Sequence, residues 1–326
     1  MTRLRVLTWH VHGSYLQYLS HAPHDFYLPV KRGRPEGYGG RPGDDDWPDN
    51  LIEIPAGEVP GLELDCVLFQ SQTQYLEDRH ELLGAEQRRL PHVFLEHDPP
   101  RESPTDTRHP VDDPNVLLVH VTPFNALMWD SGRTATAVVE HGVTVPDGVR
   151  YSGELERGLV VVNNLARRGR RLGRDVFEEV RERVPLDLVG MGSEELGGLG
   201  EVPHRELPAF AARYRFLFNP IRYTSLGLAV CEAMLLGMPV VALATTEYAT
   251  AIENGVSGYV DTDVDVLVAR MCALLADPED ARRVGEGARR RACERFGIER
   301  FASDWDRLLR RAVASEAAPA AEAAAA

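Results

Sequence analysis

Short runs of consecutive apolar residues recur along almost the whole chain, and most are followed by a segment with helical periodicity. Several of these runs, such as Asp65–Phe69 and Phe216–Asn219, are continuous rather than alternating. Strands that are covered on both faces of a parallel sheet have this pattern, because helices pack against each face. The sequence therefore predicts an α/β protein whose sheets are parallel.

The predicted elements form two series, one in each half of the chain. We expect strands at Leu4–Trp9, Asp25–Val30, Leu51–Ile54, Asp65–Phe69, His92–Glu96, Asn115–His120 and Ala137–Glu140. A second series is expected at Gly158–Val162, Leu186–Val189, Phe216–Asn219, Val240–Leu243 and Gly258–Val260. The predicted helices are Ser14–Ser20, Gln74–Leu83, Pro123–Trp129, Arg174–Val184, Pro208–Tyr214, Leu228–Leu236, Val264–Ala276, Pro278–Phe296 and Arg300–Ala312.

Two series of this kind predict two doubly wound, Rossmann-like domains that face a cleft. A chain of 326 residues has the usual length for two domains. We expect the first domain at residues 1–145, a linker at 146–156, which has turn residues without periodicity, and the second domain at 157–299. The Ala-rich tail at 314–326 is expected to be disordered. Ligands of doubly wound sheets bind beyond the carboxyl ends of the strands, so the cleft is the expected site.

Composition excludes several classes of function. The net charge of −14 argues against a nucleic-acid or membrane-surface partner. No apolar run approaches the roughly 20 residues of a membrane span. The four cysteines are scattered, without a Cys-x-x-Cys pair, which is typical of a reduced, cytoplasmic protein.

The segment 218–242, FNPIRYTSLGLAVCEAMLLGMPVVA, is the most informative stretch. A strand ends at Pro220, and a turn containing Gly227 leads into a helix whose amino end would bind an anion such as phosphate. Glu232 is a single carboxylate in an otherwise apolar helix, and it needs a hydrogen-bonding partner if it is buried. Two partners are open: a neighbouring Arg, or the hydroxyl groups of a sugar.

This segment resembles the donor-binding signature of GT-B glycosyltransferases of the GT4 group. The resemblance continues beyond the segment and covers most of residues 157–312, more weakly 1–143. The matching residues are Pro220, Gly227, Leu228, Glu232, Ala233, Met234, Gly237, Pro239, Val240, Val241, Ile252, Asn254, Gly255 and Gly258.

The resemblance implies roles for these residues. Glu232 would bind the ribose of a nucleotide-sugar donor. The turn from Ser225 would meet the donor diphosphate, with the backbone amides of Leu226, Gly227 and Leu228. Thr224 departs from the pattern, because the family has there a Glu that contacts the donor sugar. We expect Thr224 to take part in catalysis and to influence the choice of sugar.

Other candidates follow earlier strands. Asn164 and Arg168 stand where the family has a phosphate-binding Arg and Lys, and Arg suits phosphate oxygens. In the first domain the resemblance implies that Gly13 lets the backbone approach the donor, and that His97 points at the donor sugar. A surface His97 paired with Asp98 is the alternative.

His10 and His12 follow the first strand and are expected on the acceptor side. They lie near His21 and His24, but these four lack zinc-site spacing. The acidic runs Asp44–Asp46 and Asp261–Asp265 are expected to be solvated. Gly190-Met-Gly192 lacks the third glycine of a dehydrogenase fingerprint. No metal and no resident cofactor are therefore expected.

The resulting hypothesis is a glycosyltransferase that moves a sugar from a nucleotide diphosphate donor to a hydroxyl group of a small molecule or glycan. The resemblance implies retention of anomeric configuration, no metal, and a helix at 300–313 that returns to the first domain. A sugar-nucleotide epimerase or phosphorylase of the same fold, and a non-catalytic sugar-nucleotide-binding protein, are the alternatives. The sequence leaves self-association, as a homo-oligomer, open.

Overall fold

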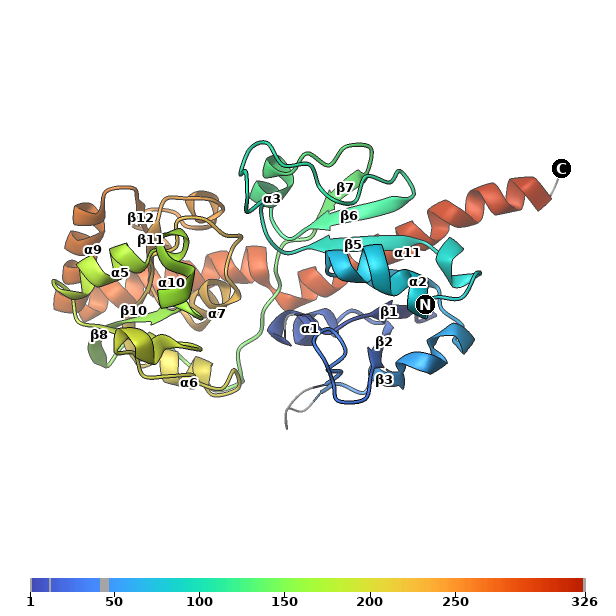
Figure 1. Ribbon diagram of the computed structural model, residues 1–326. Helices are drawn as coiled ribbons and strands as arrows, with labels where there is room; N and C mark the ends of the chain where they lie inside the picture. The colour runs from blue at the N-terminus through green and yellow to red at the C-terminus, as the bar shows by residue number, and fades with distance from the viewer. Residues whose placement is uncertain (1, 12, 42–46, 325–326) are drawn as a thin grey trace. The chain divides into compact units, whose positions relative to one another are not determined.

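The computed structural model describes residues 2–11, 13–41 and 47–324, and gives only the backbone for residues 13 and 315–324. The predicted acceptor-side His12 and the acidic run Asp44–Asp46 lie outside the residues so described. The chain divides into two compact units (Figure 1). Unit 1 comprises Met1–Glu140 and Ile298–Ala326, and unit 2 comprises His141–Gly297.

Unit 1 contains a seven-stranded sheet in the order β3-β2-β1-β4-β5-β6-β7. All of its strand pairs are parallel. The strands are β1 Arg5–Thr8, β2 Asp25–Val30, β3 Leu51–Pro55, β4 Cys66–Phe69, β5 His92–Glu96, β6 Val116–His120 and β7 Ala135–Val138. The chain starts at the centre with β1, moves to one edge, and returns to β4 beside β1. The order therefore reverses between β1 and β4.

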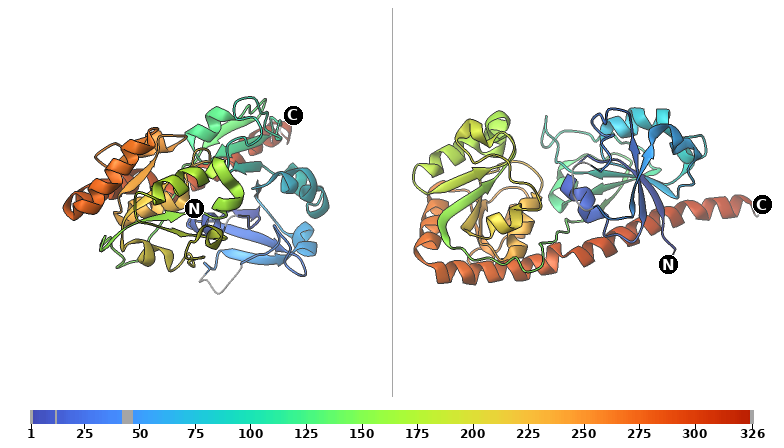
Figure 2. Two further views of the ribbon diagram at one scale, coloured as in Figure 1. Left: turned by 60° about the vertical axis from the view of Figure 1, so that its left-hand side comes forward. Right: turned by 90° about the horizontal axis from the view of Figure 1, so that it is seen from below.

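The helical segments of unit 1 are mostly short. They are α1 Gly13–Leu19, η1 Ala56–Gly61, η2 Gln74–Asp78, α2 Arg79–Leu82, η3 Gln87–Arg89, α3 Pro123–Met128 and α11 Ile298–Ala324. Helix α11 contacts α1 and β4. It is the red helix that leads to the C-terminus in both views of Figure 2. The indole Nε1–H of Trp305, on α11, donates to the buried Tyr15 hydroxyl on α1 at 3.2 Å. The last helix is thus part of the core of unit 1.

Unit 2 contains a five-stranded sheet in the order β12-β11-β10-β8-β9, again with parallel pairs. Its strands are β8 Leu155–Val161, β9 Leu186–Val189, β10 Tyr214–Asn219, β11 Val240–Leu243 and β12 Gly258–Asp261. The strand order reverses between β8 and β10.

The helices of unit 2 surround a continuous apolar core. They are α4 Leu165–Arg168, η4 Gly169–Leu172, α5 Arg174–Arg181, η5 Ser193–Leu196, α6 Leu207–Ala211, α7 Leu228–Leu236, α8 Tyr248–Ala251, α9 Val264–Ala276 and α10 Pro278–Phe296. Phe177 on α5 and Met271 on α9 are buried in one cluster with Phe216 of β10. Helix α7 is buried on nearly all sides, in agreement with its apolar sequence.

The predicted α/β class with two doubly wound parallel sheets is confirmed, and each predicted strand is present. Several boundaries differ. Strand β8 begins at Leu155, inside the predicted linker 146–156. Helix α6 ends at Ala211, because Tyr214 already belongs to the apolar run of β10. Strand β7 begins two residues before the prediction, at Ala135. Helix α11 runs to Ala324 through the tail expected to be disordered, in keeping with the high helix propensity of alanine.

Candidate functional site

The topology of unit 2 singles out one edge of its sheet. Ligands of doubly wound sheets bind at the carboxyl ends of the strands, where the strand order reverses. In unit 2 this point lies after β8 and β10. Asn164 and Arg168 follow β8, and the turn Thr224–Leu228 follows β10. Two motifs that are distant in the sequence therefore meet at the same edge.

The loops after β8 and β10 are in close contact. Gly173 has a φ of +82°, and a Cβ atom at this position would lie 1.9 Å from the carbonyl oxygen of Pro220. The backbone N–H groups of Arg222 and Tyr223 both donate to the carbonyl oxygen of Arg171, at 3.1 and 3.2 Å. The approach requires glycine at position 173, because only glycine lacks the atom that would collide.

An ion pair between Arg222 and Asp175 reinforces this contact. Both guanidinium NH groups of Arg222 donate to the Asp175 carboxylate, and one also donates to the carbonyl oxygen of Arg170. Hydrogen bonds from Arg222 hold the pKa of Asp175 below its usual value. Arg170, in the loop after β8, also pairs with Asp175.

The turn after β10 leads into α7 with Gly227 as the N-cap residue. The Gly227 N–H donates to the Tyr248 hydroxyl at 3.4 Å, and the Asn219 side-chain amide donates to the same hydroxyl at 3.3 Å. The Gly227 amide, which we expected to meet the donor, is therefore engaged by Tyr248 in this structure. Burial raises the pKa of Tyr248, so its hydroxyl is protonated at neutral pH.

Ser225 gives this turn an unusual feature. Its side chain is 6% exposed, and its Oγ has no hydrogen-bonding partner among the described residues. A buried hydroxyl without a partner costs free energy, so such a group is expected to serve a ligand or a water molecule. It lies next to the amino end of a nine-residue helix, where an anion is favoured. Thr224, beside it, is half-buried.

Glu232 lies one turn into α7 and is 5% exposed. Its Oε1 is 3.2 Å from Nε2 of His204, which lies shortly before α6. A histidine, which was not considered from the sequence, is therefore one protein partner of this carboxylate in the structure.

The loop after β8 is held by the loop after β9. Asn164 has a left-handed backbone, with φ 55°, and its N–H donates to the Met191 carbonyl at 2.6 Å. The Met191 N–H donates to Oδ1 of Asn163 at 2.9 Å. Asparagine tolerates this conformation better than most residues. Arg168 is the last residue of α4, the short helix that begins directly after Asn164.

The corresponding edge of unit 1 lies after β1 and β4. Nδ1 of His10 is 2.7 Å from the Gly40 carbonyl oxygen, which can only accept, so Nδ1 carries the proton. Burial lowers the pKa of His10, so that the ring is neutral at neutral pH. Gly13 begins α1, as expected for a glycine at the turn between a strand and a helix.

His97 follows β5 and belongs to a defined hydrogen-bond network. The Gln70 amide NH₂ donates to Oγ1 of Thr8 and to the carbonyl of Trp9, which leaves Oε1 of Gln70 to accept from Nε2 of His97 at 3.0 Å. The alternative pairing with Asp98 is not observed, because Asp98 pairs with Arg101. His97 also meets the edge of the Tyr15 ring.

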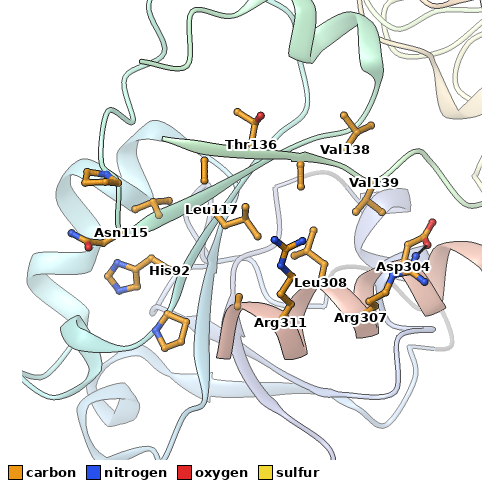
Figure 3. A pocket seen from close by; sticks show the side chains of 16 residues that line it. His92, Asn115, Leu117, Thr136, Val138, Val139, Asp304, Arg307, Leu308 and Arg311 are labelled. Atoms are coloured by element: carbon orange, nitrogen blue, oxygen red, sulfur yellow. Dashed lines mark hydrogen bonds and ion pairs between the residues drawn. The ribbon is translucent and has the colours of Figure 1, made fainter. Parts of the chain in front are cut away.

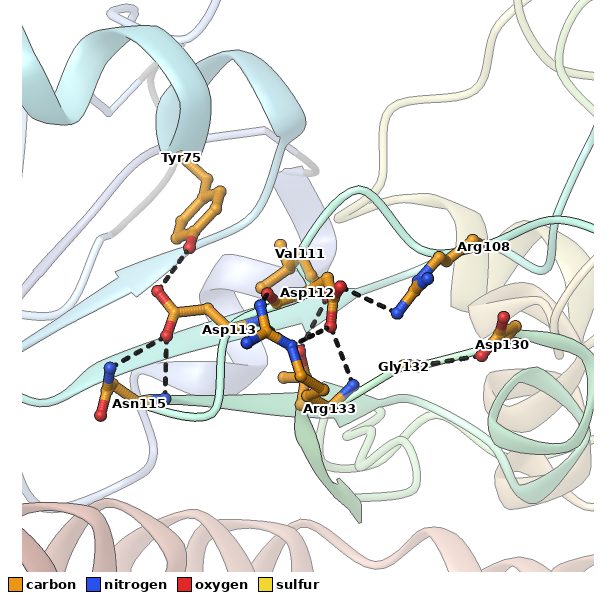
Figure 4. A network of polar contacts seen from close by, with 10 residues as sticks. Tyr75, Arg108, Val111, Asp112, Asp113, Asn115, Asp130, Gly132 and Arg133 are labelled. Atoms are coloured by element: carbon orange, nitrogen blue, oxygen red, sulfur yellow. Dashed lines mark hydrogen bonds and ion pairs between the residues drawn. The ribbon is translucent and has the colours of Figure 1, made fainter.

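Two further features of unit 1 carry no predicted site residue. Figure 3 shows a cavity of about 980 Å³ lined by residues of β5, β6, β7 and α11, including His92, Leu117 and Arg311. It lies toward the strand starts His92 and Val116 rather than their carboxyl ends. Figure 4 shows a polar network through which Asp112 binds Arg108 and Arg133. It connects the segment before β6 to the segment before β7.

The described residues contain no cluster of three or more His, Cys, Asp or Glu side chains that could hold a metal ion. Among the same residues, no helix is both long and apolar enough to cross a membrane.

Sequence reasoning missed His204, Tyr248, Asn219, Arg222 and Gln70. Asn219 and Arg222 flank Pro220 of the recognised segment, so their position could have indicated them. His204, Tyr248 and Gln70 are far from their partners along the chain, and only the fold brings them together.

Two doubly wound parallel units, one with a glycine-containing turn into a helix where its strand order reverses, form the architecture of the GT-B class. Residues 156–277 match the family described as glycosyl transferases group 1. The resemblance found in the sequence is therefore confirmed for unit 2, and the fold is confirmed for both units.

Comparisons with known proteins agree with this assignment. The chain is 33% identical, over 136 residues, to the lipopolysaccharide core biosynthesis mannosyltransferase LpcC of Rhizobium leguminosarum, which covers 40% of this chain and 38% of that protein. A 41.2 kDa protein of the Klebsiella pneumoniae cps region is 27% identical over 137 residues, 39% of this chain and 31% of that protein. The match thus spans about a third of the length of these curated relatives.

Solved structures share the fold over nearly the whole chain. Sucrose-phosphate synthase from Thermosynechococcus elongatus has a TM-score of 0.69 at 17% identity, covering 96% of this chain and 100% of that one. HepE of Anabaena in complex with UDP has a TM-score of 0.67 at 16% identity, covering 95% of this chain and 100% of that one.

Proposed function

We propose that this protein is a glycosyltransferase that moves a sugar from a nucleoside diphosphate sugar to a hydroxyl acceptor. The observation that carries the proposal is the arrangement after β8 and β10 in unit 2. There the buried Ser225 hydroxyl, which has no partner in the described part of the chain, lies beside the amino end of α7, the helix that carries Glu232. The loop after β8, which contains Arg168 and Arg171, packs on the same turn. The family of residues 156–277 and the UDP complex of HepE support a nucleotide donor.

Each group has a chemical task in this proposal. The amino end of α7 and the Ser225 hydroxyl stabilise the charge that develops on the leaving diphosphate. Glu232 accepts hydrogen bonds from the ribose hydroxyls. Arg168 and Asn164 are the proposed contacts of the phosphates from the loop after β8. His97, in unit 1, is the proposed contact of the donor sugar, and its Nε2–H is directed by Gln70.

We further propose that transfer proceeds with retention and without a metal ion, so that catalysis rests on positioning and charge stabilisation. Thr224 is the proposed determinant of the sugar, because it replaces a carboxylate with a neutral hydroxyl. The acceptor is proposed to be a small molecule or a glycan.

A panel of nucleotide sugars tests the proposal. Thermal shift first identifies the nucleotide that stabilises the protein, since a ligand of the native state raises the melting temperature. Release of the nucleoside diphosphate is then measured with and without acceptors, in buffer containing a chelator. We expect slow hydrolysis that accelerates with a suitable acceptor. Binding without turnover for every donor and acceptor would contradict an enzymatic role, and recovery of an epimerised sugar nucleotide would contradict transfer.

A further inference from the structure

His204 has a defined place beside the most buried carboxylate of the candidate site. Its backbone lies in a segment held at both ends: the Gly190 N–H donates to the Gly200 carbonyl at 2.9 Å, and the Pro203 carbonyl accepts from Glu206 and Leu207. Helix α6, which follows, packs on α7. The main chain that carries His204 is therefore fixed relative to Glu232 by β9 on one side and by α6 on the other.

The hydrogen bond between His204 and Glu232 can run in only one direction. A carboxylate can only accept, so Nε2 of His204 donates to Oε1 of Glu232 across the 3.2 Å between them. The side chain of His204 is 34% exposed, whereas that of Glu232 is 7% exposed. The imidazole is thus the more accessible member of the pair.

Two physical consequences follow. A carboxylate with this little exposure is costly unless its oxygens accept hydrogen bonds, and His204 supplies one in the absence of ligand. A carboxylate accepts about four hydrogen bonds in all, so one from His204 is compatible with two more from a vicinal diol. The bond also restricts the rotation of the carboxylate, which lowers the entropy lost on binding.

We propose that His204 is a positioning residue that orients Glu232 toward the 2′ and 3′ hydroxyls of a ribonucleoside diphosphate. The pair, rather than Glu232 alone, then determines how strongly the protein prefers a ribonucleotide over an analogue without these hydroxyls. This inference rests on the proposed function, because it assumes that Glu232 meets the ribose of the donor.

The test is a cycle of two ligands and several variants. The affinities of uridine diphosphate and guanosine diphosphate are measured by calorimetry. The nucleotide that binds more tightly is then compared with its 2′,3′-dideoxy analogue. Wild type, His204→Ala, His204→Gln, His204→Phe and Glu232→Gln are titrated with both ligands. Arg205→Ala is the matched control, because Arg205 is the exposed neighbour of His204 and pairs with Glu206. Thermal unfolding of each variant verifies that it is folded.

We expect wild type to prefer the ribonucleotide, and His204→Ala to reduce this preference roughly 10-fold, as for the loss of a hydrogen bond to a charged group. His204→Gln should retain most of the preference, because its amide N–H can donate to Glu232. His204→Phe fills the space without a donor and should behave as Ala does. Arg205→Ala should leave both affinities unchanged.

The outcomes separate the two proposals. If His204→Ala and His204→Phe weaken both ligands equally, or neither, the positioning role is overturned while the proposed function stands. If wild type binds both forms equally, the ribose role of Glu232 and this inference are overturned together. If wild type binds no nucleoside diphosphate, the proposed function itself is overturned.

Discussion

Gly173 and Pro220 approach so closely that a Cβ atom at position 173 would lie 1.9 Å from the Pro220 carbonyl oxygen. This contact joins the loop after β8 to the loop after β10, and thus the basic segment to the turn that begins α7. A methyl group at position 173 would therefore separate the two halves of the candidate donor site.

Gly173→Ala is therefore expected to lower both stability and nucleotide affinity. The left-handed φ and the collision together predict a loss of about 2–4 kcal/mol in the free energy of unfolding. Gly148→Ala is the control, because Gly148 also has a positive φ, +83°, but a Cβ atom at position 148 would have nothing within 4 Å. Urea unfolding and nucleotide titration measure both effects. Equal losses in the two variants would show that contact with Pro220 is unimportant.

Ser225→Ala is expected to separate stability from binding. Removing a buried hydroxyl that has no partner should leave the melting temperature unchanged or raise it slightly. The affinity for the nucleoside diphosphate should fall by about 0.5–1.5 kcal/mol, the usual value of a hydrogen bond. Thermal unfolding and calorimetry on the same preparation measure the pair of effects. A clear loss of stability with unchanged affinity would assign Ser225 a structural role instead.

The Arg222–Asp175 pair predicts a dependence of stability on pH. Because hydrogen bonds from Arg222 lower the pKa of folded Asp175, its contribution is fully present above the unfolded pKa of about 4, and is lost as the pH falls through the lower folded pKa. The difference in unfolding free energy between wild type and Asp175→Asn should thus be constant near neutral pH and shrink in acid.

Urea unfolding at several pH values measures this difference. Glu178→Gln, which breaks the exposed pair with Arg174, serves as a control and should have a smaller effect at every pH. A difference that grows as the pH falls would contradict the assignment.

Gln70→Leu tests whether the network in unit 1 serves His97. Without the Gln70 carbonyl oxygen, Nε2 of His97 loses its acceptor and the ring can turn. We expect kcat for sugar transfer to fall on the order of 10–100-fold, since small misplacements of a reacting group have effects of this size. Nucleotide affinity should remain, because the proposed phosphate contacts lie in unit 2. Arg101→Ala, which removes only the partner of Asp98, should leave kcat unchanged. An unaltered kcat in Gln70→Leu would remove His97 from the proposed mechanism.

The elements of the fold could be predicted because their signals are local. Continuous apolar runs such as Phe216–Asn219 indicated strands covered on both faces, and the structure has them in two parallel sheets. The turn before Leu228 and the buried position of Glu232 followed from neighbouring residues in the same way. The ends of the helices and strands were predicted less accurately than their presence. Helix α6 shows the reason, because this short helix and the following strand share one apolar stretch.

The arrangement of the site depended on the tertiary structure. The sequence alone determined that Glu232 is a single carboxylate in an apolar helix that follows a glycine-containing turn. Only the fold decided that His204 hydrogen-bonds to Glu232, that Tyr248 holds the amide of Gly227, and that Gly173 meets Pro220. Each of these contacts joins segments from different strand–helix units. Their distances depend on strand order and helix packing, which no short-range pattern in the sequence encodes.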